Sequence, residues 1–349
     1  MGYFNPEPKK RREDFFDMER EWNSLDRALS KGKLAIVTGL RRYGKTSLIL
    51  TYINESGKRY VYLDCRLLPP AVSVNSFRAL LESELAKNSW GIRLLENVRS
   101  FEVQLGGFGL KVSGKGEESL LRTLKAIEGS VLIIDEAQAL RASSYRFDAL
   151  LAYIFDILDI KLIISGSQVG LLYRFLRLED PEAPLYGRAY SEVRLSPLPG
   201  EKAREFLARG FEQEGMAVDE GLIEDAVENL DGVIGWLTYF GHSMAAGGLS
   251  AERIYEMASL LAADELKGAL KLYGPGEPRY REALRIIATL GSASWSEVRR
   301  GIEARLGRMT DSTLSNVLRN LSDAGFIAKN EGRYAVVDPV QRRGILMHL

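Results

Sequence analysis

Short apolar runs alternate with stretches of helical periodicity between residues 33 and 198. The runs at 130–134 and 161–165 are apolar at nearly every position, which is typical of strands that helices cover on both faces. The predicted strands are Leu34–Thr38, Tyr60–Asp64, Ser130–Ile134, Lys161–Ser165 and Ser191–Leu195, and helical patterns lie between them, for example at Thr46–Ile53, Ser76–Ala86 and Glu117–Ile127. This alternation predicts an α/β fold with a doubly wound parallel sheet.

A different pattern interrupts this alternation at Phe101–Val112. Phe101, Val103 and Leu105 occupy alternate positions, and the same spacing returns after Gly106 and Gly107. Two glycines suit a hairpin turn because that turn needs positive φ. The pattern therefore predicts a β-hairpin insertion, which we interpret as a surface flap without a catalytic role.

Strand patterns end near residue 198, and helical patterns follow at Glu201–Arg209, Glu220–Asn229, Val233–Phe240 and Ala251–Leu270. Pro199 and Gly200 mark the change, and Gly274–Pro278 is the clearest linker in the chain. We therefore expect an α/β core at residues 1–198 and a small helical domain at residues 199–273.

The last part of the chain, residues 274–349, has three helical patterns at Tyr280–Leu290, Ser294–Leu306 and Thr310–Ala324. A hairpin pattern follows, with Phe326–Lys329 and Tyr334–Val337 on either side of a turn. Leu314, Val317, Leu318 and Leu321 form one apolar face on the third helix. Three helices closed by a hairpin predict a winged-helix domain.

Composition narrows the functional classes. The chain has 349 residues, with 47 Lys and Arg against 47 Asp and Glu, so it is not a uniformly basic nucleic-acid coat. One cysteine and two histidines argue against a disulfide framework, a Cys/His zinc site and a serine-histidine-aspartate triad. Charges follow the N-terminus without an apolar stretch, and Leu150–Ile164 is broken by charged residues. We expect a cytoplasmic protein with no membrane segment.

The sequence Gly39-Leu-Arg-Arg-Tyr-Gly-Lys-Thr46 is a complete Walker A motif. It follows a predicted strand and precedes a predicted helix, whose first amides favour a phosphate anion. Lys45 is expected to reach the β- and γ-phosphates of ATP, and the Thr46 hydroxyl to ligate Mg²⁺. The alternative is a glycine-rich turn without a ligand. The residues predicted to contact ATP or ADP here are Gly39, Leu40, Arg41, Arg42, Tyr43, Gly44, Lys45, Thr46 and Ser47.

A buried strand that ends in two acids, Asp135 and Glu136, has the Walker B pattern. Asp135 is expected to hold Mg²⁺ through water, and Glu136 to accept a proton from the attacking water. The second acid favours hydrolysis over transfer of phosphate to a small acceptor. The alternative is that both acids only terminate a strand. Ser165–Gln168, at the end of the fourth strand, are candidates for sensing phosphate or orienting water, with Ser165 as a candidate catalytic residue.

These motifs, together with Pro184-Leu-Tyr-Gly-Arg188, resemble those of the archaeal-type AAA+ ATPases. The resemblance covers residues 15–340 and is nearest to the signal-transduction ATPases with numerous domains and to the origin-recognition-type initiators. It implies a P-loop NTPase core that is followed by a helical lid and a winged helix. Walker A with an Asp-Glu pair is common to many ATPases, whereas the 184–188 segment is more specific.

The resemblance also implies roles for three further residues. Arg188 corresponds to an arginine finger that acts on the nucleotide of a neighbouring subunit, which implies a homo-oligomer; a structural salt bridge is the alternative. Phe16 lies in the entry motif near the adenine, although Met18 departs from the usual residue. Trp236 lies in a lid segment that packs near the nucleotide. The lid has no clear sensor arginine, which departs from the pattern of AAA+ remodelling machines.

Residues 275–349 carry 12 Lys and Arg against 8 Asp and Glu, a net charge of +4. A basic winged helix favours DNA binding. However, Arg319 is the only basic residue on the predicted outer face of its third helix, and winged helices also bind proteins. Two functions therefore remain open. The first is an ATP-hydrolysing switch that couples nucleotide state to the lid and the winged helix. The second is a DNA-binding initiator or regulator in which ATP is mainly structural.

Overall fold

The computed structural model describes residues 2–106 and 115–349, which form two compact units. The core unit consists of Met18–Gly39 and Lys45–Leu195. The lid unit consists of Met1–Asp17, Leu40–Gly44 and Ser196–Leu349. The Walker A motif is thus divided, because Leu40–Gly44 pack with the lid unit while the residues on either side belong to the core unit.

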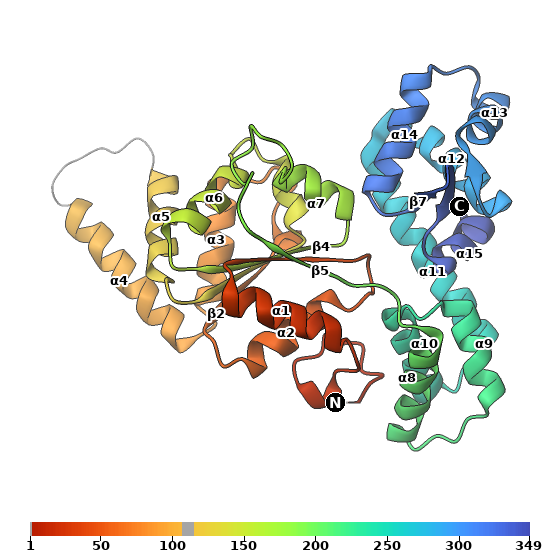
Figure 1. Cartoon of the computed structure of the whole chain (residues 1–349), viewed down its shortest axis with the longest axis horizontal. Helices are drawn as coiled ribbons and strands as arrows, with labels where there is room; N and C mark the ends of the chain where they lie inside the picture. Colours follow the sequence, from red (N-terminus) through yellow and green to blue (C-terminus); the bar gives the residue numbers. More distant parts are fainter. Residues whose placement is uncertain (1, 107–114) are drawn as a thin grey trace. The chain divides into compact units, whose positions relative to one another are not determined.

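A five-stranded parallel sheet forms the centre of the core unit (Figure 1). Its strands are β1 (Leu34–Thr38), β2 (Tyr60–Asp64), β3 (Val131–Asp135), β4 (Lys161–Gly166) and β5 (Ser191–Arg194), in the order β2-β3-β4-β1-β5. All five predicted strands are present within one residue. Since β4 lies between β1 and β3, the carboxyl ends of these three strands bring the two Walker motifs and Ser165 to one edge of the sheet.

Helices cover both faces of this sheet. The helices of the core unit are α1 (Glu19–Lys31), α2 (Lys45–Glu55), α3 (Val74–Leu85), α4 (Ser89–Gly106), α5 (Lys115–Ala126), α6 (Phe147–Ile157) and α7 (Val169–Leu176), with 3-10 turns at Cys65–Leu67 and Ala137–Ala142. In Figure 1, α1 and α2 lie on one face, and α3, α5 and α6 lie on the other. This confirms the doubly wound α/β fold.

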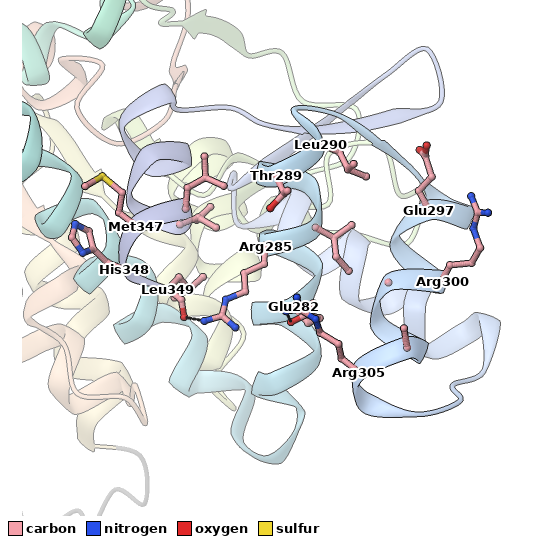
Figure 2. A pocket seen from close by; sticks show the side chains of 15 residues that line it. Glu282, Arg285, Thr289, Leu290, Glu297, Arg300, Arg305, Met347, His348 and Leu349 are labelled. Carbon is pink, nitrogen blue, oxygen red and sulfur yellow. Dashed lines mark hydrogen bonds and ion pairs between the residues drawn. The ribbon is translucent and has the colours of Figure 1, made fainter.

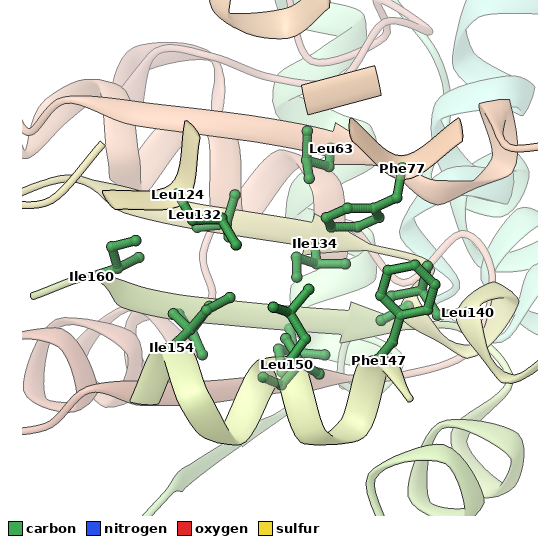
Figure 3. Close-up of a cluster of buried hydrophobic side chains, with 14 of the residues drawn as sticks. Leu63, Phe77, Leu124, Leu132, Ile134, Leu140, Phe147, Leu150, Ile154 and Ile160 are labelled. Atoms are coloured by element: carbon green, nitrogen blue, oxygen red, sulfur yellow. The ribbon is translucent and has the colours of Figure 1, made fainter. Parts of the chain in front are cut away.

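Alternate strand residues face a large apolar cluster on the α3, α5 and α6 side. Leu132 and Ile134 of β3 pack there against Phe77, Phe147 and Leu150, all of them buried (Figure 3). Their neighbours along the strand point to the opposite face, which α1 and α2 cover. Burial on both faces explains the continuous apolar runs in the sequence.

The predicted hairpin at Phe101–Val112 is wrong over residues 101–106, which form the last turns of α4. Phe101 and Leu105 continue a helical spacing that begins at Leu94 and Val98. A spacing of four, three and four residues satisfies helical periodicity over the longer stretch, and this outweighs the local alternation. Residues 107–112 of the prediction lie outside the described residues.

The lid helices are α8 (Gly200–Gln213), α9 (Glu220–Leu230), α10 (Ile234–Gly247) and α11 (Ala251–Leu270). Residues 2–17 pack on them, although the sequence boundary placed these residues with the core. Phe4 is 1% exposed, and a Cβ at either Gly210 or Gly241 would lie 2.3 Å from its ring. Two glycines on α8 and α10 therefore make the slot that holds the N-terminal segment.

The winged helix follows a 3-10 turn at Lys271–Gly276 and contains one helix that the sequence analysis missed. Its elements are α12 (Glu277–Leu290), β6 (Ala293–Ser294), α13 (Trp295–Leu306), α14 (Asp311–Asp323), β7 (Ile327–Asn330), β8 (Arg333–Val336) and α15 (Pro339–His348). The strands form an antiparallel sheet in the order β6-β8-β7. The missed helix, α15, begins with Asp338 as its N-cap and Pro339 at its first position.

Within the described ranges, none of the helices combines the length and the hydropathy that a membrane crossing requires.

Candidate functional site

The phosphate-binding loop between β1 and α2 has a backbone that glycine makes possible at two points. Gly39 has a φ of 147° and Gly44 a φ of 88°. A Cβ at Gly39 would lie 3.0 Å from the Leu195 carbonyl oxygen and from its Cβ, so a side chain there would clash with the neighbouring strand end. The loop can thus turn closely around an anion, as the motif predicted.

Lys45 is the buried cation of this loop. Its side chain is 6% exposed, and its Nζ donates a hydrogen bond to the Gly39 carbonyl oxygen over 2.7 Å. The Lys45 side chain therefore folds back along the loop, toward the carbonyl oxygen of Gly39. A buried positive charge at the first residue of α2 complements a phosphate group.

Asp135, at the end of β3, is the hydrogen-bonding centre of the core site. It is 1% exposed. Its Oδ2 accepts from the Thr46 hydroxyl at 3.1 Å and from the Tyr62 hydroxyl at 2.5 Å, and its Oδ1 accepts from Ser165 at 2.5 Å. Thr46 and Asp135 therefore lie together as predicted. A hydroxyl and a carboxylate at this distance fit the oxygen ligands of Mg²⁺, which such sites hold largely through water.

Ser165, a candidate catalytic residue, lies beside the Walker B aspartate, and its hydroxyl donates to Asp135. Its role toward phosphate or water stays a prediction. β4 pairs with both β1 and β3, so its last residues lie between the two Walker strands. Ser165 therefore orients the Walker B aspartate in this structure.

Glu136 adopts left-handed backbone geometry, with φ of 52°, directly after the strand. Its Oε2 accepts three hydrogen bonds: from the Ser167 amide at 3.1 Å, from the Ser167 hydroxyl at 2.7 Å and from Gln138 Nε2 at 2.5 Å. A non-glycine residue in this conformation needs such outside contacts to hold it. The carboxylate is thus fixed apart from Asp135, although the two residues are adjacent.

Tyr62 and Gln138 belong to this site but were missed from the sequence. Burial and the neighbouring Asp135 carboxylate raise the pKa of the Tyr62 phenol, so it remains a hydrogen-bond donor. A Cβ at Gly166 would lie 2.4 Å from Gln138 Oε1, so a glycine at the end of β4 leaves room for the amide. The Asp-Glu-x-Gln spacing was a usable signal for Gln138; the position of Tyr62 depends on strand pairing.

The middle of the Walker A motif is held within the lid unit. Arg42 Nη1 and Nη2 donate to the Glu265 carboxylate at 2.9 and 2.6 Å, and the Arg42 guanidinium stacks on Trp236 at 3.8 Å. Tyr43 is buried, and burial together with the charges of Asp338 and Asp231 raises its pKa to about 12. The lid thus contacts the phosphate loop itself.

Phe16, which was predicted near the adenine, is buried in an aromatic cluster of the lid unit. Its ring lies 5.5 Å from that of Tyr3 and 5.4 Å from that of Phe206, both edge-on. Trp236 is 1% exposed beneath Arg42. Nucleotide contacts of either side chain stay predictions.

Arg188 is held inside its own chain. Its Nη2 pairs with Asp156 Oδ2 at 2.5 Å and its Nε donates to Asp156 Oδ1 at 2.9 Å. Its Nη1 donates to the Pro184 carbonyl oxygen. The same pairing lowers the pKa of Asp156. This contact matches the salt-bridge alternative, while the role toward a neighbouring subunit stays a prediction.

A separate groove of about 1000 Å³ lies in the winged helix, between α12, α13 and α15 (Figure 2). Arg285, Arg300 and Arg305 line it together with Glu282 and Glu297. Arg305 pairs with Glu282 at 3.1 Å, and Glu297 pairs with Arg333 of β8 at 3.1 Å. These pairs neutralise much of the charge in the groove.

The chain is similar to known ATPases. Residues 15–239 match a family model described as an ATPase domain predominantly from Archaea, and residues 277–337 match the C-terminal winged helix-turn-helix domain of MCM proteins. The solved structure of the Walker-type ATPase PABY2304 of Pyrococcus abyssi is 32% identical, with 99% of each chain covered and a TM-score of 0.81. The RuvB branch migration motor of Thermotoga maritima is 16% identical over 95% of each chain, at a TM-score of 0.48, and carries no inference about this chain. No curated protein matches significantly.

A complete phosphate loop, the paired acids after β3 and a family match over most of the chain point to one assignment. The protein belongs to the family of ATPase domains found predominantly in Archaea, and it carries a winged helix after the lid.

Proposed function

We propose that this protein binds ATP with Mg²⁺ and hydrolyses it, and that the nucleotide state is passed to the lid and the winged helix. The observation that carries the proposal is that the two acids after β3 have different hydrogen-bond partners. Asp135 is directed toward Thr46, whereas Glu136 is held by Ser167 and Gln138. One acid is therefore available for metal binding and the other for proton transfer.

Thr46 and Asp135 would hold Mg²⁺, since the hydroxyl and the carboxylate lie 3.1 Å apart and are the oxygen ligands that this ion prefers. The bound ion would neutralise charge on the β- and γ-phosphates. Tyr62 and Ser165 fix the aspartate and leave its oxygens with defined partners.

The chain's own groups supply the remaining steps. Lys45 would place its ammonium against the phosphates, and the loop amides would cradle them. Glu136 would accept the proton of the attacking water while the new P–O bond forms and ADP leaves. Ser167 and Gln138 keep the Glu136 carboxylate oriented, so that it need not reorganise during the reaction.

Two substitutions test this proposal by steady-state ATP turnover and by calorimetric titration with MgADP. Lys45→Ala should lose nucleotide binding, because no other lysine lies in the loop. Glu136→Gln should keep binding and lose about 10²–10⁴ in turnover, since the amide cannot accept the proton. Glu182→Gln, an exposed change in the same unit, serves as the control. Wild-type turnover in Glu136→Gln would show that another group activates water.

A second candidate is DNA binding by the winged helix, with ATP mainly structural. The observation that favours it is the exposed face of α14, which presents Ser312, Ser315, Asn316 and Arg319. These side chains can donate to and accept from base edges, and the domain carries a net charge of +4. Arg333, which the wing could otherwise offer, is tied to Ser292 and Glu297.

Duplex binding at several salt concentrations separates the two candidates. An affinity that falls steeply with salt, with a slope reduced by about one in Arg319→Ala, supports DNA binding. ATP turnover that duplex DNA leaves unchanged, together with no duplex affinity at low salt, supports the switch and leaves the winged helix as a protein-binding domain.

A further inference from the structure

We propose that Gly235, Trp236 and Glu265 position the phosphate-binding loop by holding Arg42, and that Asp338 links this hold to the last helix of the winged helix. The proposal deepens the function proposed above and rests on it, because it assumes that the loop binds a nucleotide phosphate. All of these residues lie within the lid unit. We refer to Arg42, Gly235, Trp236 and Glu265 as the arginine clamp.

The side chain of Arg42 is held on two sides. Both terminal nitrogens donate to Glu265 on α11, at 2.9 and 2.6 Å, in the two-pronged arrangement that fits a carboxylate. The face of the guanidinium stacks on Trp236 of α10 at 3.8 Å. Arg42 is thus bound to two lid helices at once, and a lysine could not make both contacts.

The backbone of Arg42 is held as well. Its φ is 67°, a left-handed conformation that needs support from neighbouring contacts. The Gly235 amide donates to the Arg42 carbonyl oxygen over 2.9 Å. A Cβ at position 235 would lie 2.5 Å from the Arg42 Cβ, so only glycine allows the two backbones to come this close. The clamp therefore sets the local shape of the loop.

Trp236 connects the clamp to the winged helix. Its Nε1 donates to Asp338 Oδ2 over 2.9 Å. The other oxygen of Asp338 accepts from the amides of Val340 and Gln341, at 2.8 and 3.2 Å, and so caps α15. One buried carboxylate thus joins the N-terminus of the last helix to the ring on which Arg42 rests.

Thermodynamic linkage gives this chain of contacts a measurable consequence. A phosphate that favours the clamped shape of the loop must stabilise the contacts that produce that shape. Nucleotide should therefore protect α10, α11 and the start of α15, and loss of the clamp should weaken nucleotide binding. Glu265, Trp236 and Asp338 are positioning residues in this scheme, since they act through Arg42.

The first test is calorimetric titration of the full chain with MgADP. Glu265→Gln should weaken binding by about 5–50-fold, within the usual range of coupling between sites. Glu256→Gln is the matched control, because Glu256 lies on the same helix and pairs only with the nearby Arg253 in the contacts described. Circular dichroism and melting of each variant exclude unfolding, and Glu265→Asp should recover part of the affinity.

A double-mutant cycle distinguishes positioning from a general structural effect. Glu265 also pairs with Arg41 at 3.5 Å, so the cycle is measured in a chain that carries Arg41→Gln. If Glu265 acts through Arg42, then adding Glu265→Gln to Arg42→Gln in that chain should change the MgADP Kd no further. Additive losses, or a Glu265→Gln variant that binds like the wild type, would overturn the clamp.

Hydrogen exchange tests the link to the winged helix. MgADP should slow exchange at the first turn of α15 in the wild type but not in Asp338→Asn. Asparagine keeps the cap through its oxygen but directs its NH₂ group at the Trp236 donor. Asp311→Asn, at an exposed residue of α14, should respond as the wild type does. Unchanged exchange at α15 in the wild type, with MgADP bound, would overturn the link.

The proposed function and the clamp fail in different ways. Absence of MgADP binding by the wild type would remove the function and the clamp with it. Binding by the wild type and loss in Lys45→Ala, with Glu265→Gln unaffected, would leave the function intact and remove the clamp alone.

Discussion

Asp135 and Glu136, the two acids after β3, differ in the hydrogen-bond donors that their carboxylates contact. Asp135 and Glu136 are adjacent in sequence, but a left-handed turn at Glu136 separates their carboxylates and gives each its own donors. Ser165 serves the first acid and Ser167 the second. Ser165 in β4 and Ser167 just after it therefore donate to different acids, although they lie only two residues apart.

Ser167→Ala should lower ATP turnover by about 10–100-fold while leaving MgADP affinity unchanged. The substitution removes the 2.7 Å hydroxyl bond to Glu136 and keeps the amide bond, and a hydrogen bond to a charged group contributes about 1.5–3 kcal/mol. Single-turnover kinetics would measure the change. Ser56→Ala, which removes a local hydroxyl bond at the end of α2, is the control. If MgADP affinity fell by the same factor as ATP turnover, Ser167 would contribute to nucleotide binding and not specifically to catalysis.

At the scale of helices and strands, close backbone approach makes glycine positions sensitive. Gly235→Ala should lower the free energy of unfolding of the lid unit by about 1–3 kcal/mol, because the new methyl group would meet the Arg42 Cβ at 2.5 Å. Gly268→Ala on α11 should have the opposite sign, since no atom lies within 4 Å and alanine favours a helix by about 1 kcal/mol. Urea denaturation of both variants would compare them, and equal stabilities would contradict the assigned contact.

The ion pair between the loop and α11 predicts a pH dependence. Burial would raise the pKa of Glu265, but hydrogen bonds from Arg42 and the charges of Arg42 and Arg41 outweigh it, so the pKa is lowered from 4.5. A lowered pKa stabilises the fold above the unfolded value, and this contribution is lost as the pH falls through the folded value. Stability of the wild type should therefore drop below about pH 4.5 more steeply than that of Glu265→Gln. Parallel pH profiles of melting temperature would exclude this pair as the cause.

The helices and strands were largely predictable where apolar residues recur at the spacing of a strand or a helix. The five strands follow from apolar runs that are buried on both faces, and α11 spans the range that its pattern indicated. The predicted hairpin failed over residues 101–106 because a short alternation was weighed above a longer helical spacing. The last helix, α15, was missed because it is short, although Asp338 followed by Pro339 is a recognisable start signal.

The site was predictable only as far as it is local in sequence. The roles predicted for Lys45, Thr46, Asp135 and Glu136 come from motifs that are contiguous in sequence. Glu265 lies 223 residues from Arg42, and Asp338 lies 102 residues from Trp236, so nothing in a local pattern connects them. Non-local ion pairs become visible only when the fold brings their helices together.

At the scale of the whole molecule, the prediction for Arg188 concerns cooperation between subunits. If it serves a neighbouring active site, turnover per subunit should rise with protein concentration in the wild type. Turnover should stay low in Arg188→Ala, because that variant loses several kcal/mol of transition-state stabilisation. Asp156→Asn releases the guanidinium from its ion pair and is the informative partner variant. Turnover that is independent of concentration, with Arg188→Ala and Asp156→Asn losing stability alike, would assign Arg188 to its own chain.

The slot that holds Phe4 has a consequence for synthesis on the ribosome. Phe4 emerges early, but the slot is incomplete until Gly241 of α10 has been made. At about 5–20 residues per second, the interval is about 10–50 s. Tyr3 and Phe16 gain their partner Phe206 once α8 has been made, whereas the slot for Phe4 is complete only when α10 has followed. The nascent chain therefore exposes a short aromatic segment until the lid helices have been made.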